Sequence, residues 1–123
     1  MVAICAGSAA CIDKDTATFI PTSTDMQKNL EEAGYTVVLT DELEGGYSGA
    51  HLKANKEDEY IEFYWLDDSE ACDYFYNRLF KLYPINRRIV KMMNKKFGNI
   101  VFCGTESAIK ASGIEIEEVE VPD

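Results

Sequence analysis

Apolar residues recur at helical spacing in three parts of the chain. The first part predicts a helix over about residues 25–33, with Thr24 as the N-cap of a capping box. The second predicts a longer helix that begins at Asp67 and ends before Pro84. The third predicts a short helix over residues 105–112, whose first residue, a threonine, is the expected N-cap.

Alternating or β-branched runs predict the strands. Residues 35–40 and 100–103 are short runs with the composition typical of strands. Apolar and polar residues alternate over 50–54, and the pattern continues over 60–65 after a polar turn at 55–58. The last two runs are therefore predicted to form a hairpin.

The local signals conflict between residues 85 and 97. Apolar spacing there suits a helical face, yet Gly98-Asn99 is typical of a hairpin turn, and we favour a strand over about 88–96. The alternating tail at 114–121 fits an edge strand or a frayed acidic end. Residues 13–18 are polar and are predicted to be a short linker.

The first eleven residues carry no charge and end in small residues before Cys11. This pattern indicates the end of the apolar region of a signal peptide, without the positively charged start that such a peptide needs. A buried first strand over Val2–Ala6 is the alternative. Residues 1–12 are therefore either a truncated signal with a lipobox-like end or a first strand. In neither case are there enough apolar residues for a spanning helix.

The composition is that of a globular protein, with 46% apolar residues, eight glycines and three prolines in 123 residues. The predicted fold class is α+β: a single antiparallel sheet of four or five strands with two or three helices packed on it. One domain is expected over residues 13–123, with an acidic tail at 114–123.

The main core is expected where the most aromatic strand meets the longest helix. Ile61, Phe63 and Trp65 share one face of their strand at a spacing of two. We expect this face to pack against Phe75 and Leu79 of the helix that follows.

The formal net charge is −10, so nucleic-acid binding is not expected. The charge is segregated: residues 41–70 hold ten acidic and two basic residues, whereas 71–113 hold eight basic and two acidic ones. We expect the two regions to lie close together and to cancel partly. The alternative is an exposed basic patch that meets an anionic partner or a membrane surface. Its candidate binding residues are Arg78, Arg87, Arg88, Lys91 and Lys95.

No motif for catalysis, for a metal or for a cofactor stands out. Cys5, Cys11, Cys72 and Cys103 show no zinc or thioredoxin spacing, and Cys72 and Cys103 could form a disulfide only in an oxidising compartment. His51 is the only histidine, and we interpret it as an exposed bystander on a strand. Cys103 precedes a helix N-terminus, which makes it the best nucleophile of the chain.

Five short stretches carry a resemblance to a known family. The order of elements resembles that of small uncharacterised lipoproteins of Gram-positive bacteria over residues 8–112. The matching stretches are Ser8-Ala9-Ala10-Cys11, Gly34-Tyr35-Thr36-Val37, Tyr60-Ile61-Glu62-Phe63, Ala71 and Gly98-Asn99-Ile100-Val101. The resemblance implies an exported domain that is anchored to the membrane through a lipid on Cys11, with no assigned reaction.

The function that we expect is a non-enzymatic binding domain, exported or anchored at the cell surface, without a cofactor. A membrane surface is then a possible partner through the lipid anchor. The alternative is a small cytosolic thiol-dependent enzyme that uses Cys103. The sequence does not identify the ligand or the oligomeric state.

Overall fold

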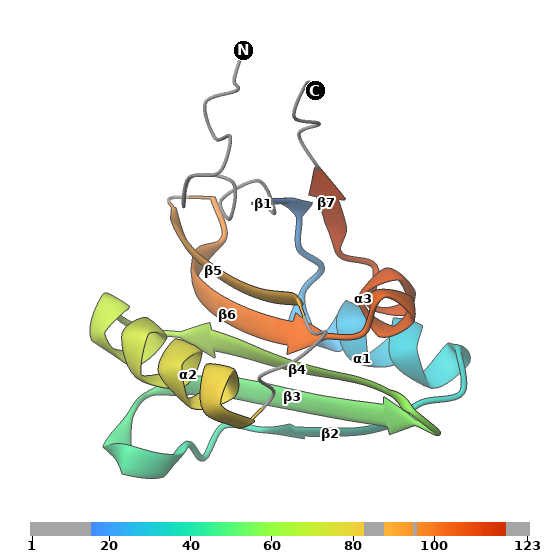
Figure 1. Cartoon of the computed structure of the whole chain (residues 1–123), viewed down its shortest axis with the longest axis horizontal. Helices are drawn as coiled ribbons and strands as arrows, with labels where there is room; N and C mark the ends of the chain where they lie inside the picture. Colours follow the sequence, from blue (N-terminus) through green and yellow to red (C-terminus); the bar gives the residue numbers. More distant parts are fainter. Residues whose placement is uncertain (1–15, 83–87, 95, 118–123) are drawn as a thin grey trace.

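The strands form two antiparallel sheets in the computed structural model, which describes residues 16–82, 88–94 and 96–117. The larger sheet has five strands in the order β2-β3-β4-β6-β5, and the smaller one pairs β1 with β7 (Figure 1). Three helices accompany them, so the predicted α+β class with a helix-covered antiparallel sheet is confirmed. The strands of the larger sheet are β2 Thr36–Thr40, β3 Gly49–Lys56, β4 Glu59–Leu66, β5 Arg88–Asn94 and β6 Gly98–Gly104.

Two hairpins, β3–β4 and β5–β6, lie side by side in the larger sheet. The predicted β3–β4 hairpin is confirmed, and its register places Leu52 opposite Phe63. Within the region where the signals conflict, Arg88–Asn94 is a strand as favoured, because β5 pairs with β6 along its whole length. The turn between β5 and β6 lies earlier than predicted, because β6 already begins at Gly98. Gly98 follows this turn with a positive φ of 80°, a conformation that glycine adopts readily.

The helices are α1 Ser23–Glu32, α2 Ser69–Leu82 and α3 Glu106–Ser112, with a short 3-10 turn, η3, at Glu44–Gly46. The first N-cap differs from the prediction: the hydroxyl of Thr22, not of Thr24, accepts a hydrogen bond from the backbone N–H of Asp25 at 3.2 Å. The helix begins at Ser23, directly after this cap, so Thr24 already lies within its first turn. Thr105 holds the N-cap position of α3, but its hydroxyl contacts the backbone of Tyr60 instead.

The helices cover opposite faces of the larger sheet (Figure 1). α1 and α3 pack together on one face, and α2 packs across β4, β6 and β5 on the other. Ile61 and Phe63 are fully buried on the α1 side, in one cluster with Met26 and Leu30.

The predicted contact between Phe63 and α2 is therefore wrong. Phe75 and Leu79 pack instead with Tyr64 and Leu66, which alternate with Phe63 along β4 and point to the other face. Because β4 is buried on both faces, its residue pattern alone does not reveal which face receives α2.

The smaller sheet joins the two ends of the described chain. β1 Thr16–Phe19 pairs antiparallel with β7 Glu115–Glu117. The linker predicted over 13–18 is thus wrong from Thr16 onward, since a long-range partner that local composition does not reveal makes it a strand. The edge-strand interpretation of the tail is confirmed at 115–117, and the possible strand at Val2–Ala6 lies outside the described residues.

None of the helices described is both long and apolar enough to cross a bilayer.

Candidate functional site

A pocket of about 500 Å³ opens on the α2 side of the larger sheet. It forms because α2 packs on β4, β6 and β5 and leaves the adjacent surface of β3 uncovered. Its floor is built by side chains of β3 and β4, one wall by α2, and the rim by residues 42–44.

Strand register places the four polar side chains of the floor together. His51 lies directly opposite Tyr64, and Lys53 lies directly opposite Glu62. Directly opposed residues of an antiparallel pair point to the same face, and residues two apart on one strand do so too. All four side chains therefore face the pocket side of the sheet, which the lining confirms.

Glu62 is the buried polar residue of the site, with only 4% of its surface exposed. Its Oε1 lies 3.1 Å from His51 Nε2, and the Tyr64 hydroxyl donates to the same oxygen at 3.5 Å. A buried carboxylate is costly unless donors surround it. With its proton on Nε2, the imidazole supplies one such donor, and the carboxylate in turn fixes the orientation of the ring.

Aromatic stacking holds the same imidazole in place. The His51 ring lies parallel to the Tyr64 ring at 4.1 Å between centroids, and Phe75 stacks on Tyr64 at 4.4 Å. Burial, reinforced by the charge of Glu62, raises the pKa of Tyr64 well above its ordinary value. The phenol is therefore neutral at physiological pH and acts as a hydrogen-bond donor.

The rim of the pocket is fastened to α2 through Glu44. Its carboxylate accepts a 2.6 Å hydrogen bond from the Tyr74 hydroxyl and forms an ion pair with Arg78 at 3.2 Å. The hydrogen bond to Glu44 raises the pKa of Tyr74. The Tyr47 ring, in the segment that follows the rim, packs on Tyr74 at 4.9 Å and adds an apolar contact with the helix. Together these contacts fix the segment that borders the pocket.

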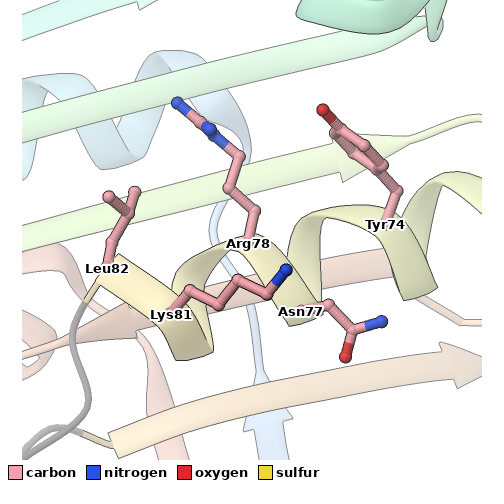
Figure 2. Close-up of a pocket in the computed structure, with 5 residues that line it drawn as sticks. All are labelled: Tyr74, Asn77, Arg78, Lys81 and Leu82. Carbon is pink, nitrogen blue, oxygen red and sulfur yellow. The ribbon is translucent and has the colours of Figure 1, made fainter.

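Figure 2 shows a second, smaller pocket along α2, of about 380 Å³. Tyr74, Arg78 and Leu82 project from the same side of the helix there, and Asn77 and Lys81 complete the lining (Figure 2). All five residues are exposed, so this pocket has no buried polar group to orient a ligand. The pocket over His51 and Glu62 is therefore the better candidate site.

Of the five basic residues predicted to bind, the structure describes the side chains of two, Arg78 and Lys91, and these two lie apart. Arg78 pairs with Glu44 at the pocket rim, which is the partial cancellation by the acidic segment that we expected. Lys91 of β5 pairs with Asp73 at 2.8 Å and lies over the Tyr76 ring, and the hydrogen bond to Asp73 raises its pKa.

These two ion pairs lie on different sides of α2. At 100° per residue, Asp73 and Tyr76 point away from Tyr74 and Arg78. Arg78 and Lys91 are therefore held by different acidic partners on different sides of the helix. Arg88 is described only as part of the β5 backbone, and Arg87, Lys95 and the lipidation candidate Cys11 lie outside the described residues.

Cys72 of α2 and Cys103 of β6 are buried thiols in the core between this helix and the sheet, and they are not bonded to each other. Burial raises the pKa of Cys72 to about 11. Cys103 is fully buried and lines neither pocket, so a substrate does not reach its sulfur in this conformation. The thiol-enzyme alternative gains no support from this placement.

Reasoning from the sequence missed the role of Glu62 and interpreted His51 as an exposed bystander. The His51 side chain is only 20% exposed and contacts both Glu62 and Tyr64. The signal in the sequence was the alternation along the hairpin, which places polar residues of both strands on the face opposite to Phe63.

Among the described residues, no group of three or more His, Cys, Asp or Glu side chains lies close enough together to hold a metal ion. Comparison of the chain with protein-family models, with curated proteins and with solved structures finds no match.

Proposed function

We propose that the chain is a non-enzymatic binding domain and that the pocket over His51 and Glu62 holds its ligand. The proposal rests on the buried carboxylate of Glu62, which lines an open pocket and fixes the partly exposed imidazole of His51. The pocket volume of about 500 Å³ is in the range of small-molecule sites.

The ligand that fits this chemistry is a small, uncharged molecule with hydroxyl groups. The lining holds the three carboxylates of Glu42, Glu44 and Glu62 against the two cations of Lys53 and Arg78, and Arg78 is already paired with Glu44. An anionic ligand would therefore find no excess of positive charge, and the net charge of −10 disfavours phosphorylated molecules further. Hydroxyl groups can both donate to Glu62 and accept from Lys53.

We propose further that the domain is exported and held at a membrane surface through a lipid on Cys11. The small residues before Cys11 and the resemblance to lipoproteins of Gram-positive bacteria support this location. The first described strand begins at Thr16, five residues after Cys11, so a lipid there would hold the β1–β7 ribbon near the bilayer.

Titration of ¹⁵N-labelled protein with neutral mono- and disaccharides tests the binding proposal. Amide shifts should concentrate at His51, Glu62 and Tyr64, and the corresponding sugar phosphates should bind more weakly. Glu62→Gln should weaken binding about 10-fold or more, because a hydrogen bond to a charged acceptor contributes about 1.5–3 kcal/mol. Glu70→Gln, an exposed change on α2, is the matched control. If no sugar at millimolar concentration shifts these amides, the proposal is wrong.

A second candidate function, acid–base catalysis, is favoured by one observation. An imidazole held by a buried carboxylate and partly exposed to a pocket can serve as a general base. The same titration distinguishes the two functions, because a catalyst converts its ligand and new product signals then grow with time. Product formation that is lost in His51→Gln would favour catalysis over simple binding.

A further inference from the structure

One edge of the larger sheet lacks the features that usually prevent edge pairing. β2 is an edge strand, and none of the described residues pairs with its outer side. Its sequence, Thr-Val-Val-Leu-Thr, contains no charge and no proline, whereas β5 at the opposite edge carries Arg88 and Lys91. Natural proteins usually protect edge strands with charges, proline or bulges. Val38 at the centre of β2 is 59% exposed.

The sequence of β2 is nearly the same when read in either direction. A two-fold axis through Val38 would place Val38 opposite the Val38 of a second copy and Thr36 opposite its Thr40. It would also place Val37 opposite Leu39. β-branched and Thr–Thr pairs directly across an antiparallel ladder are favourable, and no like charges meet in these five positions.

The residues that flank β2 add charge complementarity to this register. The next pair would place Asp41 of one copy opposite Tyr35 of the other. Lys56 Nζ lies 5.7 Å from the centroid of the Tyr35 ring and donates to the Ala33 carbonyl at 2.8 Å. The exposed carboxylate of Asp41 would thus arrive beside an ammonium group, and the two-fold axis would create this contact twice.

We propose that β2 pairs antiparallel with β2 of a second copy, in the register centred on Val38, to give a symmetric dimer with a continuous ten-stranded sheet. This contact is independent of the pocket. A five-residue ladder is smaller than the interface of a stable dimer. The dimer is therefore reversible and forms at high local concentration, such as that of chains anchored side by side.

Sedimentation equilibrium of the full chain from 10 µM to 1 mM in physiological salt should show a monomer–dimer equilibrium. Val38→Lys should abolish the dimer, because it places two ammonium groups directly opposite each other. Asp41→Lys and Lys56→Asp should each weaken it, and the double variant should restore it. A monomer throughout this range, or an undiminished dimer in Val38→Lys, would overturn the proposal. Thermal unfolding of each variant verifies that the fold is intact.

Disulfide trapping tests the register directly, in a full chain that carries Cys5→Ser and Cys11→Ser. Val38→Cys should form a covalent dimer with diamide, because opposed Cα atoms lie about 4.5–5.5 Å apart, within the range of a disulfide. Thr36→Cys is the matched control, since the two copies of residue 36 would lie about 13 Å apart. Equal rates of cross-linking by the two variants would exclude this register and overturn the proposal.

Discussion

The separation of the aromatic core into two layers gives the most decisive stability prediction. Phe63 lies on the α1 side of the sheet and stacks on Phe102 at 5.1 Å, whereas Phe75 lies on the α2 side. Residues in contact couple energetically, and residues on opposite faces of a sheet without shared partners add. Two double-mutant cycles, Phe63→Leu with Phe102→Leu and Phe63→Leu with Phe75→Leu, therefore have different expected outcomes.

The magnitudes follow from burial and ring geometry. All three phenylalanines are at most 1% exposed, so each leucine variant should lose about 1 to 2 kcal/mol of stability. The stacked pair Phe63 and Phe102 should couple by about 0.5–1.5 kcal/mol. The pair Phe63 and Phe75 should add to within about 0.5 kcal/mol. Replacement by leucine rather than alanine leaves enough stability to measure, because alanine would cost about 3–5 kcal/mol at each site.

Urea unfolding followed by far-UV circular dichroism measures these free energies. The urea dependence should be the same in all variants, which verifies that they unfold between comparable states. Coupling of 1 kcal/mol or more between Phe63 and Phe75, with additivity between Phe63 and Phe102, would refute the assignment of the two faces.

Three other predictions concern titration, anchoring and surface charge. The raised pKa of Cys72, about 11 against an ordinary 9.0, gives a stability contribution that is complete below pH 9 and is lost as pH rises toward 11, by at most about 3 kcal/mol. Cys72→Ala should therefore flatten the alkaline decline in urea midpoint, and an unchanged slope would contradict this. Mass spectrometry of native membranes should find a diacylglyceryl-sized addition at Cys11, whereas an unmodified Met1 in the soluble fraction would exclude it. Chain lacking residues 1–12 should not sediment with anionic vesicles, and salt-sensitive binding that Arg87→Glu with Arg88→Glu removes would instead establish a basic docking surface.

The helices and the two hairpins of the larger sheet could be predicted from the sequence because their signals are local. The periodicity before Pro84 and the alternation across residues 50–65 each depend on near neighbours in the chain. The local signals over residues 88–94 conflict, and the strand there is established by its pairing with β6.

The placement of α2 and the pairing of β1 with β7 depend on distant residues. Nothing local to Thr16–Phe19 indicates a partner at Glu115–Glu117. β4 is buried on both faces, so either face was an acceptable partner for α2.

The candidate site was missed for a related physical reason. Glu62 and His51 are separated by a turn, and only the register of the hairpin brings their side chains within 3.1 Å. A charged residue within a strand is usually exposed, and the burial of Glu62 follows from α2 and the rim segment, which the alternation does not reveal.

The pairing of β1 with β7 also has a consequence for the order in which parts of the molecule fold and unfold. The Thr18 hydroxyl reaches the Glu115 carbonyl across 97 positions of the chain. Closing a loop of this length costs about 4 kcal/mol of chain entropy. The ribbon should therefore form after the hairpins, and it should exchange its amide hydrogens faster than β4 and β6 do. In a molecule anchored through Cys11, a pulling force would therefore separate β1 from β7 first. The chain between the anchor and the larger sheet would then lengthen while the sheet and its pocket stayed folded.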